Sequence, residues 1–183
     1  MKPGLYGDIS EADYHGHKGS LSTSMAKQLL PPSCPAKFKA NEGKPWIKKA
    51  FDFGHVVHAL VLGKGDEIAV LDFDSRRTNA YKDAEKQARA ANQTPILRAD
   101  YDEAQAVADS VLANPHAAAL FSNGTAEQSA FWVDEETGIM RRARFDYLPD
   151  AIEGQRLNLA DLKTADSSEP EAFGTDLRGA FEL

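Results

Sequence analysis

Four charged side chains in the second half of the chain have the types and the order that metal-dependent chemistry requires. Glu127 and Asp146 come first, and Asp161 and Lys163 follow in a triplet of the form Asp-x-Lys. Carboxylate oxygens are the ligands that magnesium and manganese prefer. A lysine two residues after such a ligand would lie beside the metal, where it could orient a water molecule or offset phosphate charge. These residues therefore suggest a hydrolytic site that uses a divalent cation.

Strands must place these side chains, and the sequence around them has the alternation of a hairpin. Polar and apolar residues alternate over residues 127–133, and the next five residues, DEETG, have turn chemistry. The alternation resumes over residues 139–148 and stops at Pro149, because proline cannot donate to a strand ladder. Asp146 therefore lies near the end of the second strand. Asp150, which follows the proline, is interpreted as a turn residue.

A third strand is predicted over residues 156–163, where Leu157, Leu159, Asp161 and Lys163 share one face. A half-buried acid and base at a strand end would need compensation from an ion or a ligand. Asp-x-Lys triplets are common, however, and an ordinary exposed salt bridge on an edge strand is the alternative. The triplet alone favours the salt bridge, and only the surrounding motifs favour a metal site.

The longest apolar helix is predicted over residues 46–62, where apolar residues recur at three- and four-residue steps. His58 lies on the buried stripe of this helix, and Gly54 precedes it by one turn. A buried histidine is often a core residue that bonds a backbone carbonyl, and on the residues alone this alternative stays open. His55 has a different helical position and is treated as secondary.

These motifs and their order resemble the core of the PD-(D/E)XK nuclease superfamily, and more narrowly the RecE-like phage exonucleases of its RecB-like branch. The residues that carry the resemblance are FDFGHVVHALVL (51–62) with its Gly-x-x-x-His signature, Glu127 with Gln128, RARFD (142–146) and LADLKT (159–164). Each motif is short, but their order and spacing together are specific. The resemblance spans residues 6–181, which is nearly the whole chain.

The resemblance implies an α/β fold with a restriction-endonuclease-like core, in which helices flank a mixed central β-sheet behind a helical N-terminal part. It implies a single nuclease domain over residues 1–183. The implied activity is a magnesium-dependent exodeoxyribonuclease that digests linear double-stranded DNA from the 5′ end in phage-type recombination. The implied partners are double-stranded DNA ends, further copies of the chain in a homo-oligomer, and a single-strand annealing protein. In the RecB-like pattern a Gln-x-x-x-Tyr helix follows the Asp-x-Lys segment, and this sequence has no such residues there.

The resemblance also assigns roles within the site. The implied ligands of one or two magnesium ions, for which manganese substitutes, are His58, Asp146, Asp161 and the carbonyl of Leu162. Lys163 would orient the attacking water, and Glu127 would bind the metal or the water network. Two other functions stay open: a DNA-binding or interaction module that has the nuclease fold without turnover, and a structure-selective endonuclease. Retention of the site residues argues against the first, and dependence on DNA ends would separate the second from an exonuclease.

Length and composition set further limits. A chain of 183 residues with 42% hydrophobic content suits one domain with a real core. The single cysteine, Cys34, excludes an internal disulfide and a four-cysteine iron–sulfur site within the chain. No apolar run approaches the ~20 residues of a membrane helix, and the N-terminal residues lack the apolar core of a signal peptide. A cytoplasmic protein without membrane contact is therefore predicted.

The formal net charge of −7 is unusual for a protein that binds DNA. Two local groups of basic residues could nevertheless follow a phosphate backbone. The first group is Lys37, Lys39, Lys44, Lys48 and Lys49, and the second is Arg141, Arg142 and Arg144. A charge run is more often a solvated face, and this is the alternative for the lysine group.

Overall fold

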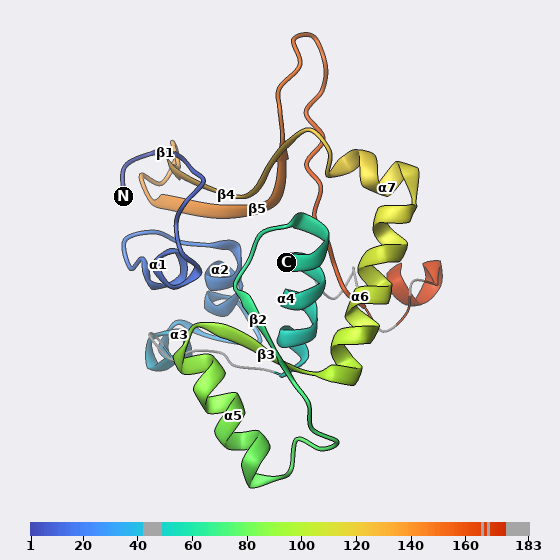
Figure 1. Cartoon of the computed structure of the whole chain (residues 1–183). Helices are drawn as coiled ribbons and strands as arrows, with labels where there is room; N and C mark the ends of the chain where they lie inside the picture. The colour runs from blue at the N-terminus through green and yellow to red at the C-terminus, as the bar shows by residue number, and fades with distance from the viewer. Residues whose placement is uncertain (42–48, 166, 168, 175–183) are drawn as a thin grey trace.

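The computed structural model describes residues 1–41, 49–165, 167 and 169–174, and Figure 1 shows their arrangement. In this part of the chain the strands form two sheets. The antiparallel sheet has the order β1-β4-β5, and its strands are Gly4–Tyr6, Gly124–Val133 and Met140–Pro149. The parallel sheet pairs β2 with β3, and its strands are Glu67–Leu71 and Gln93–Leu97. The predicted α/β class is confirmed, and the two strand orientations are divided between the two sheets.

The predicted hairpin is present as β4 and β5. The ladder runs from the pair Gly124 and Pro149 to the pair Val133 and Met140. At the turn, one carboxylate oxygen of Asp134 accepts hydrogen bonds from the backbone N–H and the hydroxyl of Thr137, at 3.0 and 2.6 Å. Gly138 closes the turn with a φ of 67°, which glycine adopts without steric cost.

The predicted third strand over residues 156–163 is wrong. After β5 the chain leaves the sheet as a long exposed excursion over residues 150–159, which extends beyond the antiparallel sheet in Figure 1. Leu157 and Leu159 are 47% and 51% exposed, so their alternation has no core face to pack against. The returning chain makes only an isolated antiparallel bridge, between Ala160 and Tyr147 of β5.

Seven labelled helices surround the sheets. Their bounds are Glu11–Gly16 (α1), Thr23–Leu29 (α2), Pro35–Asn41 (α3), Lys49–Leu62 (α4), Asn79–Ala90 (α5), Arg98–Ala113 (α6) and Pro115–Leu120 (α7). Serine hydroxyls cap the first two helices, because Ser10 accepts from the N–H of Asp13 and Ser22 accepts from the N–H of Met25. The sequence predicted the longest apolar helix over residues 46–62; α4 accounts for residues 49–62, and residues 46–48 lie outside the described residues.

The hydrophobic core is centred on α4. Its buried members come from α4, β3 and α6, and they are Val56, Val57, Val61, Ile96, Ala104 and Ala108. Helix α4 also contacts β5, so it lies between the two sheets (Figure 1). On the far side of the parallel sheet, Arg89 of α5 makes a bidentate ion pair with the buried Asp52 of α4, at 2.7 and 3.2 Å. The ion pair therefore joins the first turn of α4 to α5.

Candidate active site

His58 of α4 and Asp146 of β5 meet at the boundary between the core and the antiparallel sheet. Nδ1 of His58 lies 3.7 Å from Oδ2 of Asp146. The side chains are 25% and 18% exposed, so each is largely covered but open to solvent on one side. Two residues that the sequence predicted to act together are thus brought together from separate elements.

The segment after the exposed excursion returns to the same point. The backbone N–H of Leu162 donates to Oδ2 of Asp146 at 2.6 Å, and the side chain of Leu162 packs against the core. Two residues later, Thr164 lies beside Gly54 of α4. A Cβ added to Gly54 would lie only 3.2 Å from the Thr164 hydroxyl oxygen. The Asp-x-Lys segment is therefore anchored against both β5 and α4, although it is not a strand.

Asp161 and Lys163 form an ion pair with each other. Nζ of Lys163 lies 2.5 Å from Oδ2 of Asp161, and the two side chains are 49% and 54% exposed. The expectation that they would be half-buried on a strand face is wrong, because that strand is absent. Their geometry is the exposed salt bridge that the sequence left open as the alternative. Both charges are nevertheless close enough to Asp146 to act on it electrostatically.

Burial dominates the electrostatics of Asp146. Desolvation raises the pKa of its carboxyl group, since the ionised form loses hydration. The hydrogen bond from Leu162 N–H, His58 and Lys163 lower that pKa, whereas the like charge of Asp161 raises it further. The net effect is a raised pKa, so the negative charge at this position is incompletely compensated. A bound cation would supply that compensation.

Glu127 stands opposite Asp146 in the hairpin register but does not form a regular pair with it. The ladder pairs Ala126 with Tyr147 and Gln128 with Phe145, which leaves Glu127 facing Asp146. Glu127 has a φ of 53°, in the left-handed region that non-glycine residues rarely adopt. It lines a neighbouring pocket of about 290 Å³, together with residues of the N-terminal segment, Lys64, Asp66 and Arg144. Its role as a site residue stays a prediction.

Asp150 occupies a different environment from Asp146. It is exposed, its backbone N–H donates to the carbonyl of Asn123, and it lines a separate pocket under the exposed excursion. Asp146 rather than Asp150 is the acid that contacts the Asp-x-Lys segment. Its register at the strand end is therefore the one that the sequence indicated.

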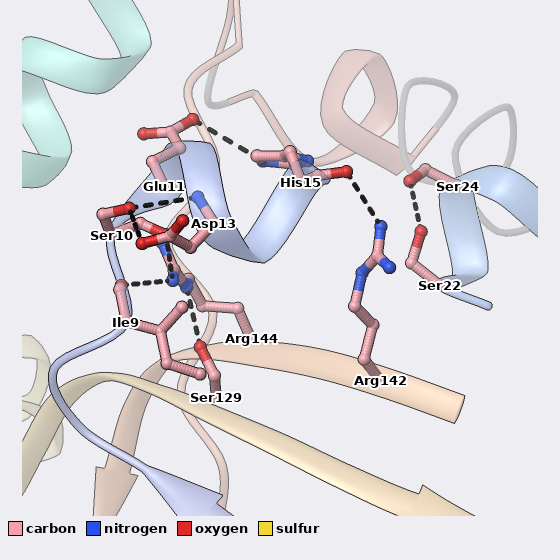
Figure 2. A network of polar contacts seen from close by, with 10 residues as sticks. All are labelled: Ile9, Ser10, Glu11, Asp13, His15, Ser22, Ser24, Ser129, Arg142 and Arg144. Atoms are coloured by element: carbon pink, nitrogen blue, oxygen red, sulfur yellow. Dashed lines mark hydrogen bonds and ion pairs between the residues drawn. The ribbon is translucent and has the colours of Figure 1, made fainter. Parts of the chain in front are cut away.

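The arginine group on β5 makes hydrogen bonds within the protein. Arg142 is only 3% exposed, and it donates to the carbonyls of His17 and Ser20 rather than facing solvent. Arg144 donates to the hydroxyl of Ser129 and the carbonyl of Ile9, at 3.0 and 2.8 Å. Figure 2 shows both guanidinium groups reaching from β5 to the two ends of α1. The prediction that they follow a phosphate backbone is wrong for Arg142, because its donors are buried inside the protein.

The lysine group is only partly described. Lys37 and Lys39 are exposed on α3. Lys44 and Lys48 lie outside the described residues, as does the side chain of Lys49. Of the five lysines predicted to follow a phosphate backbone, the structure therefore places the side chains of two, Lys37 and Lys39, on the surface.

Lys64 is a further residue near the site, and no pattern in the sequence singled it out. Its amine donates to the carbonyl of Gly7 at 2.5 Å and to the carbonyl of Ala126 at 3.5 Å. It thus links the end of α4 to the antiparallel sheet next to Glu127. The only sequence signal is its position between two glycines, Gly63 and Gly65, both of which have positive φ.

The donor types at the site fit a hard divalent cation. Carboxylate and carbonyl oxygens are the donors that magnesium and manganese prefer, and His58, whose imidazole is a donor more typical of transition metals, already faces the carboxylate of Asp146. Within the described ranges, no group of three His, Cys, Asp or Glu side chains is close enough to hold a metal ion. Asp161 is paired with Lys163 instead, so a complete centre would require its carboxylate to turn away from that lysine.

One comparison with known proteins identifies a relationship. A family model described as a PDDEXK-like domain of unknown function (DUF3799) matches residues 22–181. The match includes the elements that carry His58, Asp146 and the Asp-x-Lys segment. No curated protein and no solved structure matches the chain. Among the helices of the described part, none has both the length and the apolar character needed to cross a membrane.

Proposed function

Because the chain belongs to the family of PDDEXK-like domains of unknown function (DUF3799), which has a nuclease-type fold, we propose that it is a metal-dependent deoxyribonuclease. The observation that carries the proposal is the meeting of three separate segments at Asp146. His58 approaches from α4, and Leu162 of the Asp-x-Lys segment bonds the same carboxylate oxygen. Such convergence of distant motif residues on one partly buried acid is typical of a catalytic site.

The more specific proposal is a 5′-to-3′ exonuclease on linear double-stranded DNA that serves phage-type recombination. Its support is the resemblance of the motif order to the RecE-like branch. Proposed partners are double-stranded DNA ends, further copies of this chain, and a single-strand annealing protein. A cytoplasmic location belongs to the same proposal, since DNA is the substrate.

In the proposed mechanism the residues that would hold magnesium, or manganese in its place, are His58, Asp146, Asp161 and the carbonyl of Leu162. The ion supplies charge neutralisation at the phosphate and a more acidic bound water. The N–H of Leu162 keeps the carboxylate of Asp146 in a fixed orientation through its 2.6 Å hydrogen bond.

Lys163 and Glu127 have the remaining roles. The amine of Lys163, once released from Asp161, would orient the attacking water and offset negative charge that develops on the phosphate. In the hydrolysis the oxygen of this water would form a bond to phosphorus as the phosphorus–oxygen bond to the leaving nucleotide breaks. The water would lose one proton to solvent, and the leaving oxygen would take up one from solvent. Glu127 lies in the adjoining pocket and would act through the water network.

A second candidate function is a DNA-binding module with little or no turnover. The observation that favours it is the ion pair between Asp161 and Lys163, in which a proposed metal ligand and the lysine proposed to orient the water are bound to each other. A structure-selective endonuclease is the third candidate. It differs from the exonuclease only in its independence of DNA ends.

The test is magnesium-dependent release of nucleotides from linear duplex DNA, with closed circular DNA alongside. The exonuclease proposal predicts that the linear form alone is degraded, and that a chelator or Lys163→Ala abolishes degradation. Cleavage of the closed circle would indicate an endonuclease. Binding of duplex DNA without any cleavage would contradict the nuclease and favour the binding module.

A further inference from the structure

Lys64 connects helix α4, which carries His58, to the antiparallel sheet, which carries Asp146. It follows the end of α4, where Gly63 has a φ of 65° and stops the helix. Its amine reaches the antiparallel sheet and donates to the carbonyls of Gly7 and Ala126, at 2.5 and 3.5 Å. The side chain is half-buried, so both hydrogen bonds are partly shielded from water.

The two ends of this link lie close to the two members of the site. At one end, His58 lies in the last turns of α4, and Lys64 follows shortly after the last residue of that helix. At the other end, Ala126 precedes Glu127, the residue that stands opposite Asp146 in the hairpin. A change in the length of the link would therefore change the separation between His58 and Asp146.

The backbone at the sheet end of the link is unusual. Glu127 has a positive φ, whereas the ladder pairs on both sides of it, those of Ala126 and Gln128, are regular. A strained residue within a regular ladder persists only where its surroundings hold it in place. The amine of Lys64, on the carbonyl of the preceding residue, is one of the groups that hold it.

We propose that Lys64 is a positioning residue that sets the separation between His58 and Asp146, and with it the affinity of the site for a divalent cation. This inference rests on the proposed metal-dependent function. It assigns to Lys64 no contact with the metal or with the DNA. Its effect passes through the carbonyls of Gly7 and Ala126 to the hairpin.

The sign of the effect of Lys64→Met on manganese binding tests the proposal. Removal of a positive charge near a cation site would by itself strengthen cation binding. Loss of a positioning contact has the opposite effect, and outer contacts of metal sites are worth about 10- to 100-fold in affinity. We expect Lys64→Met and Lys64→Gln to bind Mn²⁺ at least about tenfold more weakly. Lys64→Arg, which keeps a long cationic donor, should restore most of the affinity.

The matched control is Lys82→Met on α5, which removes an exposed lysine away from the link and should leave Mn²⁺ binding unchanged. Affinities are measured by electron paramagnetic resonance titration of the full chain, with circular dichroism as the check on folding. If Lys64→Met or Lys64→Gln folds and binds Mn²⁺ as tightly as the wild type, or more tightly, the inference is overturned.

A metal-free measurement separates this inference from the proposed function. Hydrogen exchange of the Leu162 amide, which donates to Asp146, reports whether the Asp-x-Lys segment stays seated between β5 and the core around α4, against which the Leu162 side chain packs. Faster exchange in Lys64→Met than in Lys82→Met supports the positioning role, and equal exchange contradicts it. A wild-type chain that binds no Mn²⁺ would refute the proposed metal function and, with it, the claim about affinity. The exchange result would still decide whether Lys64 holds α4 and the antiparallel sheet together.

Discussion

Nδ1 of His58 lies 3.7 Å from Oδ2 of Asp146, and that same oxygen accepts the N–H of Leu162 at 2.6 Å. One carboxylate thus joins a core helix, the second strand of the hairpin, and the Asp-x-Lys segment. Burial raises the pKa of this carboxyl group, so its environment favours the neutral form. An ionised group that destabilises the free protein but interacts favourably with a bound ligand is expected at a functional site.

Asp146→Asn should stabilise the metal-free protein at neutral pH. The raised pKa of Asp146 means that the folded protein bears the cost of the ionised carboxylate above that pKa, and that this cost disappears as the pH falls toward the ordinary value of the unfolded chain. The amide oxygen of asparagine still accepts the Leu162 N–H. We expect a rise in Tm of about 2–4 °C near pH 7, equivalent to about 1 kcal/mol at this chain length.

Thermal denaturation in chelator, repeated as the pH is lowered, checks the sign of this effect. The advantage of the variant should shrink as the wild-type carboxyl becomes protonated. Asp150→Asn, at an exposed position, is the control and should not alter Tm. A variant less stable than the wild type at neutral pH would show that the charge of Asp146 stabilises the fold.

Gly54→Ala should impair activity without lowering stability. Alanine is favoured over glycine within a helix by about 1 kcal/mol. Its Cβ would lie 3.2 Å from the Thr164 hydroxyl oxygen, however, and would push the Asp-x-Lys segment away from α4. Small displacements of catalytic groups cost up to about 10²-fold in rate, so we expect a loss of about 10- to 100-fold in nucleotide release.

A second substitution separates this displacement from other effects. Thr164→Ala removes the hydroxyl that the new Cβ would meet, so the double variant should recover most of the activity. Equal losses in the single and double variants would contradict the packing argument.

The sequence predicted the hairpin and the site acid on it because alternation, turn residues and a terminal proline agree over residues 127–149. The prediction of a third strand was wrong because alternation shows only which residues would share a face of a strand. It does not show whether another surface lies against that face, and Leu157 and Leu159 have no such surface to cover. Strand β3 was missed because it is short and contains Pro95, a residue that ordinarily argues against a strand.

The sequence indicated the residues of the candidate site, but it did not indicate how all of them are arranged. The positions of His58 and Asp146 follow from local periodicity and register. The pairing of Asp161 with Lys163, and the link made by Lys64, depend on where the excursion over residues 150–159 returns and on how the two sheets are joined. Those are long-range features that no local pattern specifies.

Arg142→Ala should strongly destabilise the fold. The guanidinium group is buried, and it donates to the carbonyl and hydroxyl of Ser20 at 3.0 and 2.9 Å, as well as to the carbonyl of His17. Its loss removes this donor from the carbonyls of Ser20 and His17, and a buried acceptor left without a partner costs about 1–3 kcal/mol. We expect a loss of about 3 kcal/mol in the free energy of unfolding, measured by urea denaturation.

The neighbouring Arg141 provides the matched control. It is exposed and makes a surface ion pair with Asp134 at 3.1 Å, so Arg141→Ala should change stability by no more than about 0.5 kcal/mol. Equal destabilisation by the two substitutions would contradict the internal role assigned to Arg142.

The most direct test of the metal-dependent nuclease is the rate of magnesium-dependent hydrolysis of linear duplex DNA by Asp146→Asn and Asp150→Asn. The account predicts that Asp146→Asn lowers the rate by at least about 10²-fold, because the site loses the acid on which its three segments converge. Asp150→Asn should retain the wild-type rate. Wild-type hydrolysis by Asp146→Asn, or loss of hydrolysis in Asp150→Asn alone, would contradict the assignment of the site.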